Sequence, residues 1–390
     1  MKHYSIVNVA AVISLLLLLF ISCNKGAVFK GEADYSDVET IRYDYTKDNF
    51  IPRDSVFGDI SFVKLETRDD NHIGMVNQVL LGDSTIIVVD WTIANGVFMF
   101  DFDGKYLGKI SGLGDVHNEY RRLSYVCKKS DNTIALFDEW SNKIMMYDER
   151  GHYIKSIYTN LLSASAMEFI SDDLMAYDIY FKFPTYNEKY GNMSFLINNL
   201  NMETKYKFGR TDFKPFSYTR CYNLYSYDNH VYCNVNFKDC IYELKEDGVK
   251  AKYRLLYGPE NVTEHSFKTK NEYNELQELY PYFDGDFVEL KDYTYVMFSG
   301  ENGRELLYKH STKETFALSS EFDNPMVTFF RHPNVRYKDN IMVCALSAAE
   351  VCYCLMAIIP QTPENNSVKA LFPGINIDTN PILFFYELVS

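Results

Sequence analysis

Carboxylates stand next to tryptophans at two places in this sequence. Asp90 precedes Trp91, and Asp138 and Glu139 precede Trp140, so each of the chain's two tryptophans has an acidic neighbour. This combination suits a sugar, because an aromatic ring offers a flat apolar platform and carboxylates accept hydrogen bonds from hydroxyl groups. Tryptophans at equivalent positions of a repeat can instead pack between the repeats. Both interpretations remain open from the sequence.

Two further groups of polar residues could do chemistry. His117, Glu119 and Tyr120 share one loop, where they could act as acid, base or ligand, or form a turn closed by a packed tyrosine. Asp284 and Asp286, in the stretch PYFDGDF, could bind a cation, form an acid pair or stand in a solvated turn. The sequence has no H-E-x-x-H, G-x-S-x-G or phosphate-loop motif. The catalytic residues, if there are any, are therefore unknown from the sequence, and we predict no firm metal site and no cofactor.

The stretch DFDG looks like the beginning of a calcium loop, because Asp101 and Asp103 alternate before Gly104. A second copy of the surrounding sequence carries Arg150 in place of the second acid, yet keeps the glycine as Gly151. A calcium site would not survive that exchange, whereas a hairpin needs only a glycine at the position with positive φ. The sequence therefore predicts a β-turn here.

These two hairpins belong to a longer repeat. The copies Ser84–Ile110 and Asn132–Ile157 alternate apolar residues with period two, as strands do. Looser copies, each with two strands around an Asp/Asn-rich turn, follow at Ala166–Tyr180, Tyr222–Asn236, Asp286–Gly300 and Asn334–Ser347. Six copies at the spacing of four-stranded blades predict an all-β fold, a six-bladed β-propeller of four-stranded antiparallel blades.

The chain divides into three predicted regions: a signal peptide at 1–22, a lipidated N-terminus and tether at 23–55, and the propeller at 56–390. The strand Ile60–Thr67 comes before the first repeat, so we expect it to complete the last blade beside the final strand PILFFYELV. Apolar residues at helical spacing predict a small helical insertion over about 260–280, between blades four and five.

The N-terminus reads as a secretory signal. Lys2 and His3 precede the apolar run Ala10–Ile21, which ends at Ser22 and Cys23. A single membrane-spanning helix is the alternative, but the run is short for a bilayer. The net charge of −14 offers no basic field for phosphates, so nucleic acid is not an expected partner.

Besides Cys23, seven cysteines remain, an odd number that cannot all pair within one chain. Cys233 and Cys240 could face one another across a hairpin, and Cys352 and Cys354 would share one face of a strand. We expect most of the seven to be small buried apolar residues.

The stretch VFMFDFDGKYLGKISGLGDVHNEY resembles an NHL-type propeller repeat, with His117 and Asn118 where relatives commonly have Pro-Gly. Phe20-Ile21-Ser22-Cys23 resembles a bacterial lipobox, with Phe20 in place of the usual leucine. Together with VKLET and IGMVNQVLLGDSTIIVVD, these features resemble the six-bladed propeller lipoproteins of the Bacteroidetes. The resemblance implies cleavage before Cys23, lipidation of that residue and a place at the cell envelope.

The interpretation that we favour is an exported, lipid-anchored propeller that binds a ligand or partner, such as a glycan or a peptide, rather than catalysing a reaction. The alternative is a carbohydrate-active lyase or hydrolase that uses loop carboxylates and His117 at the channel mouth. The third is a scaffold for another envelope protein. A propeller hosts all three, so the fold alone does not choose among them.

Overall fold

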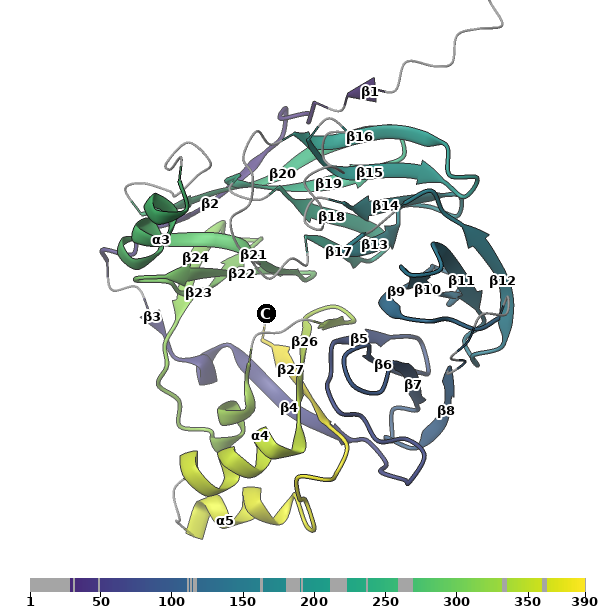
Figure 1. Cartoon of the computed structure of the whole chain (residues 1–390). Coiled ribbons are helices and arrows are strands. Elements are labelled where there is room, and N and C mark those ends of the chain that lie inside the picture. The colour runs from purple at the N-terminus through teal and green to yellow at the C-terminus, as the bar shows by residue number, and fades with distance from the viewer. Residues whose placement is uncertain are drawn as a thin grey trace, which may run out of the picture.

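The computed structural model describes residues 29–389 apart from positions 31, 48–49, 111, 113, 115–117, 162–163, 180–189, 191, 211–222, 236–237, 259–268, 332–334 and 360–362. Six sheets stand around a central axis, and each contains a meander of four antiparallel strands (Figure 1). The predicted six-bladed β-propeller is therefore confirmed. Cys23, Cys221 and His117 lie outside the described residues.

Five blades use consecutive strands, which follow one another from the channel outward. Blade 1 is β5 (Gln78–Leu81), β6 (Ile86–Asp90), β7 (Gly96–Phe100) and β8 (Tyr106–Ile110). Blade 2 is β9 (Leu123–Lys128), β10 (Ile134–Asp138), β11 (Lys143–Tyr147) and β12 (Tyr153–Tyr158). Blade 3 is β13 (Ala166–Phe169), β14 (Leu174–Asp178), β15 (Met193–Asn199) and β16 (Thr204–Arg210). Blade 4 is β17 (Leu224–Tyr227), β18 (His230–Asn234), β19 (Cys240–Lys245) and β20 (Gly248–Tyr257). Blade 5 is β21 (Pro281–Glu289), β22 (Tyr293–Gly300), β23 (Glu305–Lys309) and β24 (Glu314–Leu318).

Blade 6 closes the ring with strands from both ends of the chain. It consists of β25 (Val335–Tyr337), β26 (Ile341–Leu346), β27 (Ile382–Leu388) and β4 (Phe57–Lys64). Strand β4 is antiparallel to β27, with Val63 opposite Leu383 (Figure 1). The prediction that the strand before the first repeat completes the last blade is confirmed.

The core lies between the blades rather than inside any one of them. Along β7, Val97 and Met99 join the apolar cluster shared with blade 2, whereas Phe98 and Phe100 join the cluster shared with blade 6. Successive side chains of a strand point to opposite faces of the sheet, so each blade contributes to two cores. This is why a strand whose side chains alternate between two faces, such as β7, can be buried along its whole length.

The segment predicted as a tether contributes three strands to the outer rim. Strands β1 (Phe29–Lys30), β2 (Glu39–Tyr43) and β3 (Phe50–Ile51) pair in parallel with the outer strands of blades 3, 4 and 5. We call these three strands the belt (Figure 1). The short helix η1 (Arg53–Ser55) follows it and leads into β4. The belt thus covers outer sheet edges, which a plain tether would leave open.

The acidic stretch of the opening repeat is a hairpin turn, as predicted. Gly104 and Gly151 have φ values of 84° and 82°, and a Cβ atom on Gly104 would lie 2.1 Å from the Lys64 carbonyl oxygen. Asp101 uses its carboxylate to accept backbone N–H groups of its own turn, at 3.0 and 2.8 Å. Asp148 does the same in the second copy.

Helices occur between blades 4 and 5, between blades 5 and 6, and within blade 6. The predicted insertion contains α3 (Lys270–Leu279), which begins at a capping box of Thr269 and Glu272. The short helix η2 (Pro325–Phe329) precedes β25. A second insertion, between β26 and β27, was not predicted. It holds α4 (Ala348–Tyr353), the π-helical turn η3 (Cys354–Ile358) and α5 (Pro363–Ala370).

The cysteine predictions need two corrections. Cys352 and Cys354 lie in the helical insertion rather than on a strand, because Ser347 and Glu350 form a capping box that starts α4. Cys233 lies opposite Tyr242 in the sheet and not opposite Cys240.

All six described cysteines are free, and five of them are buried, as expected for most. Burial raises the pKa of Cys344 to about 12 and that of Cys240 to about 11, which keeps both thiols protonated and unreactive.

The disc has two chemically different faces. Because neighbouring strands are antiparallel, the turns from first to second strand and from third to fourth strand lie at one end of each blade. We call that end the turn face. The turns from second to third strand and the connections between blades lie at the other end, which we call the loop face.

Candidate functional site

Asp90 and Asp138 each end the second strand of a blade. On the loop face their carboxylates accept hydrogen bonds from backbone N–H groups. Asp90 is fully buried and accepts four backbone N–H groups at 2.8–3.1 Å, two from the loop before β5 and two from the turn after β6. Asp138 is equally buried and accepts four in the same arrangement at 2.9–3.3 Å. These carboxylates join the blade connections, because each one satisfies N–H groups that would otherwise be left without an acceptor.

The two tryptophans occupy different environments. Trp91 is half-buried and stacks on Tyr125 of the next blade, with ring centroids 6.3 Å apart and an interplanar angle of 28°. Trp140 is 62% exposed. Its neighbour Glu139 accepts a hydrogen bond from the Ser124 hydroxyl at 3.2 Å. The ring of Trp91 therefore packs between blades, whereas Trp140 stands at the surface.

The loop that carries His117 also serves packing where it is described. Tyr120 is fully buried, and its hydroxyl donates to the carbonyl oxygens of Asn95 at 2.8 Å and Ile110 at 3.0 Å. Burial raises the pKa of Tyr120 well above its usual value of 10, so this hydroxyl stays protonated. A Cβ atom on Gly114 would lie 1.8 Å from a carboxylate oxygen of Glu119, which shows how tightly the loop folds over that side chain.

A central cavity with a volume of about 1380 Å³ lies where the inner strands of the blades meet. Turn residues of all six blades line its rim on the turn face, and the segment Met75–Asn77 lines it near the loop face. The loop-face candidates Asp90, Trp91, Asp138, Glu139, Trp140, Glu119 and Tyr120 do not line it. The structure thus separates these residues from the central cavity.

Charged side chains at the rim pair across blade boundaries. Lys129 of blade 2 lies 3.1 Å from the Asp172 carboxylate of blade 3. Lys291 of blade 5 lies 3.5 Å from the Asp339 carboxylate of blade 6, and its backbone N–H donates to the Asp339 carbonyl at 2.9 Å. The rim is therefore a collar of opposite charges that links neighbouring blades.

Below the rim, the wall carries carboxylates, hydroxyls and an amide. Glu168 lies within β13 and is 4% exposed, and the Tyr125 hydroxyl donates to it at 3.4 Å. Asp286 lines the cavity from β21 of blade 5. Gln78 donates to the Val126 carbonyl at 2.7 Å and accepts from the same residue's N–H at 3.3 Å, which closes the inner edge of β9.

The stretch PYFDGDF forms a bulge in the inner strand of blade 5. The pairing of β21 with β22 shifts register between Phe283 and Phe287, and Gly285 has a φ of 106°. The Tyr225 hydroxyl donates to the Gly285 carbonyl across the boundary with blade 4. The bulge brings Asp286 to the cavity. Among the described residues no group of three or more His, Cys, Asp or Glu side chains is placed to hold a metal ion.

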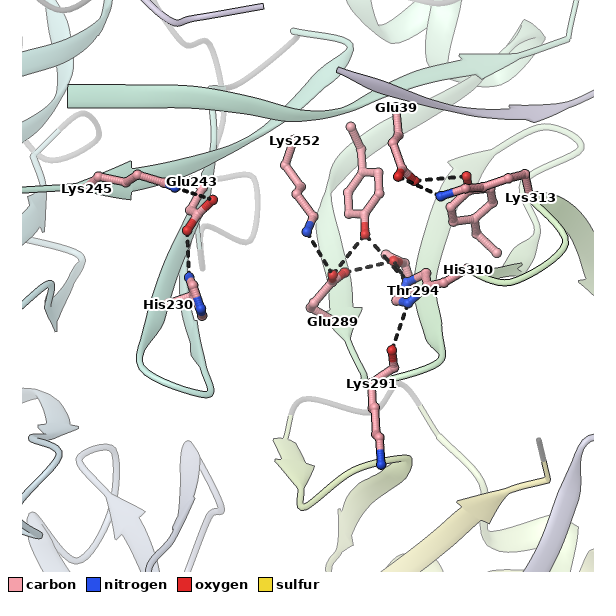
Figure 2. Close-up of polar contacts among 12 residues, drawn as sticks. Glu39, His230, Glu243, Lys245, Lys252, Glu289, Lys291, Thr294, His310 and Lys313 are labelled. Carbon is pink, nitrogen blue, oxygen red and sulfur yellow. Dashed lines mark hydrogen bonds and ion pairs between the residues drawn. The ribbon is translucent and has the colours of Figure 1, made fainter. Parts of the chain in front are cut away.

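A chain of acid, hydroxyl and imidazole lies between blades 4 and 5 (Figure 2). Buried Glu289 accepts hydrogen bonds from the hydroxyls of Tyr253 and Thr294, both at 2.8 Å. The Thr294 oxygen is 2.9 Å from Nε2 of His310, and Nδ1 of His310 is 2.9 Å from the Lys291 carbonyl oxygen.

This chain resembles catalytic machinery, but its hydroxyl is inaccessible. Thr294 is fully buried, and neither Glu289, Thr294 nor His310 lines the cavity. Its end point is the backbone of Lys291, a rim residue. We therefore assign the chain a supporting role, in which it fixes one segment of the rim.

Sequence reasoning missed most of the cavity wall. Asp286 was named, but Tyr125, Glu168 and Tyr225 were not, although each lies in the first strand of a recognised repeat. First strands line the channel of a propeller, so a charged residue inside the otherwise apolar strand Ala166–Phe169 was the available signal.

A family model described as Domain of unknown function (DUF4934) matches residues 38–387. The chain belongs to this family. The match begins one residue before β2, so the DUF4934 region includes the second and third belt strands and all six blades. Among proteins with curated descriptions, none matches this DUF4934 chain.

Two of the solved structures similar to this DUF4934 propeller come from Bacteroides. A protein from Bacteroides fragilis, which its name places among exported proteins, is 18% identical, with a TM-score of 0.72 over 91% of this chain and 100% of its own. A member of the DUF4221 family from Bacteroides vulgatus is 9% identical, with a TM-score of 0.49 over 86% of this chain and 97% of its own. At 18% identity, the similarity to the Bacteroides fragilis protein shows the fold alone.

None of the helices described for the DUF4934 propeller is both long and apolar enough to span a membrane.

Proposed function

We propose that this DUF4934 propeller is a binding module of the cell envelope, and that its ligand, a glycan or a peptide segment, occupies the central cavity. The single observation that carries the proposal is the cavity of about 1380 Å³, which opens on the turn face. Large concave sites with a few convergent polar groups are where small ligands and chain ends usually bind. Loops and turns on a rigid scaffold are suited to recognition.

The envelope location rests on two supports. The structural relative from Bacteroides fragilis carries export in its name. The sequence Phe20-Ile21-Ser22-Cys23 follows an apolar run and ends in the cysteine that a lipobox requires. Lipidation of Cys23 would tether the chain to a membrane close to β1, which begins at Phe29.

The anchoring proposal is tested in cells by fractionation. The full chain and its Cys23→Ser variant are expressed in a bacterial host that lipidates exported proteins, and membrane and soluble fractions are compared. We expect the parent chain in the membrane fraction and the variant released from it. Equal distribution of the two would contradict anchoring through Cys23.

The cavity proposal is tested by thermal stabilisation of the full chain in detergent against panels of glycans and peptides. A ligand present at about one hundred times its dissociation constant adds about 2.7 kcal/mol to the free energy of unfolding. Ser226 lines the cavity, so Ser226→Trp places a bulky ring at its wall, whereas exposed Ser311 lies on the turn face outside it. Ser311→Trp is therefore the matched control.

We expect stabilisation of the parent and of Ser311→Trp, and its loss in Ser226→Trp. Stabilisation that survives Ser226→Trp would place the ligand elsewhere on the molecule. A complete absence of stabilisation by every glycan and peptide would contradict the cavity proposal itself.

A further inference from the structure

We propose that the loop-face end of blade 4 binds a calcium ion through side-chain amide oxygens. The site is formed by Asn223, Asn234 and the backbone at Gly285, where β17 and β18 meet the bulge of β21 (Figure 1). None of these three residues lines the central cavity, so the proposal does not depend on the cavity ligand.

The two asparagines of blade 4 correspond to polar residues of blade 1. Asn77 precedes β5 and Asp90 ends β6, whereas Asn223 precedes β17 and Asn234 ends β18, and both pairs lie one position beyond the same end of a strand ladder. In blade 1 the Asn77 amide oxygen accepts two backbone N–H groups from the turn after β6, at 2.9 and 3.1 Å. The Asp90 carboxylate accepts four.

The corresponding oxygens of blade 4 receive no such donors. Asn223 and Asn234 are each 1% exposed, and within the described part of the chain neither amide oxygen has a hydrogen-bond partner. A buried acceptor without a partner destabilises a fold, and native structures contain few of them. A bound cation would supply the missing attraction for both oxygens at once.

The two oxygens meet at one place beside Gly285. A Cβ atom on this glycine would lie 2.8 Å from the Asn234 oxygen and 3.2 Å from the Asn223 oxygen. The Asn223 amide nitrogen donates to the buried Asp178 carboxylate at 3.2 Å, so the orientation of this amide is fixed and its oxygen points away from the acid. Carboxylates behind metal ligands commonly orient them in this way.

Calcium suits ligands of this kind. It binds about six to eight oxygens from carboxylates, amides, carbonyl groups and water in a flexible geometry, whereas magnesium requires a near-octahedral arrangement and retains water. Amide oxygens do not belong to the His, Cys, Asp and Glu groups considered above. Gly285 is also the centre of the stretch PYFDGDF, which the sequence marks as a candidate for cation binding.

A cation at this place would also support the cavity wall. The Tyr225 hydroxyl of blade 4 donates to the Gly285 carbonyl of blade 5, and both Tyr225 and Asp286 line the cavity. The bound ion would hold the bulge of β21 against blade 4 from the loop face. It would thereby fix the position of one part of the wall.

The experiment measures calcium binding by the full chain in detergent, with isothermal titration and thermal melts in Ca²⁺, in Mg²⁺ and in EGTA. Asn234→Leu removes one oxygen and keeps the approximate shape of a buried group without a partner, so this variant should fold. Asn234→Asp adds a negative charge at a position where blades 1 and 2 already carry an aspartate. Asn198→Leu is the matched control, because Asn198 is also 1% exposed with both amide atoms unpaired, but lies at the turn-face end of β15.

We expect saturating Ca²⁺ to raise the melting temperature of the parent and of Asn198→Leu by about 2 °C or more, and EGTA to reverse the shift. Asn234→Leu should lose this response, and Asn234→Asp should bind Ca²⁺ about tenfold more tightly, because affinity rises with ligand charge. A parent without a calcium response, a response that persists in Asn234→Leu, or tighter binding of Mg²⁺ than of Ca²⁺ would overturn the proposal. Each of these outcomes leaves the proposed cavity ligand unaffected.

Discussion

The two faces of the disc use carboxylates in opposite ways. On the loop face, Asp90 and Asp138 are fully buried and each receives four backbone N–H groups from the connections between strands and blades. On the turn face, Asp172 and Asp339 stay exposed and contact lysine side chains across blade boundaries. The first arrangement builds the scaffold, and the second surrounds the mouth of a cavity.

This difference shows what an aspartate at the end of a strand means. The same residue type followed by a turn occurs on both faces, so the local sequence looks alike. Its availability to a ligand depends on whether the loops on either side bring their N–H groups onto it. Asp90 and Asp138 are thereby withdrawn from a ligand, whereas Asp172 and Asp339 remain accessible to solvent.

The strongest test of the difference between the two faces is to remove a loop-face carboxylate. Asp90→Ala leaves four backbone N–H groups without their acceptor, and each buried donor left unpaired costs about 1–3 kcal/mol. We expect the free energy of unfolding to fall by about 3 kcal/mol or more, measured by urea denaturation. Asp90→Asn keeps an acceptor oxygen and should lose less. Equal small losses in both variants would contradict the scaffold role.

A hydroxyl on the same face should have the next largest effect. Tyr120→Phe removes the donor to two buried carbonyl oxygens, so we expect a loss of about 1–2 kcal/mol in the same assay. Tyr158→Phe is the control, because Tyr158 is 71% exposed and its change should stay within about 0.5 kcal/mol. A Tyr120→Phe variant as stable as that control would weaken the distinction between the faces.

Glu39 of the belt is a carboxylate whose expected effect on stability lies between those of the loop-face and turn-face aspartates. Burial alone would raise the pKa of Glu39, but hydrogen bonds from Lys313 at 2.6 Å and Tyr308 at 3.0 Å outweigh it and hold the pKa below its usual 4.5. A carboxyl whose pKa is lowered in the folded state stabilises the fold above its unfolded pKa, and this contribution disappears as the pH falls through the folded pKa.

Thermal melts from neutral pH down to below 4.5 therefore test the belt. The advantage of the parent chain over Glu39→Gln should be present at neutral pH and shrink as the medium becomes more acid. Comparing the two proteins removes the titration of all other acids. A difference that stays constant with pH would contradict the assignment.

The rim pairs should have the smallest effect on stability. Lys129 is 19% exposed at its side chain and Asp172 is 76% exposed, so solvent screens their attraction. We expect Asp172→Asn to change the free energy of unfolding by less than about 1 kcal/mol, and by less still at high salt. A loss comparable to that of Asp90→Ala would mean that the collar also holds the blades together.

The strands and the closure of the ring were predictable because each repeat carries its own turn chemistry. Gly104 and Gly151 need positive φ values, and that need is visible in two copies of one pattern. The belt was not predictable in the same way. Glu39–Tyr43 is a short strand whose parallel partner, β20, lies more than two hundred residues away and shares no turn with it. The edge with which β2 pairs exists only after blade 4 has folded.

The sequence did contain a local signal for the second helical insertion, but neighbouring residues that favour strands obscured it. Ser347 and Glu350 form a capping box, yet Val351, Cys352 and Tyr353 also favour strands. The cavity depended on geometry that no single segment contains. Its lining residues come from all six blades and surround one hollow only after the ring has closed.

The pairing of β4 with β27 has a consequence for how the chain acquires its shape during synthesis. Strand β4 leaves the ribosome near the beginning of translation, whereas its partner Ile382–Leu388 emerges near the end. Until then, blade 6 lacks an inner neighbour for β4, and the ring cannot become a closed disc. Such long-range pairing folds slowly, because distant segments must meet before contacts compensate for the lost chain entropy. The nascent protein thus stays open until its last strand is made.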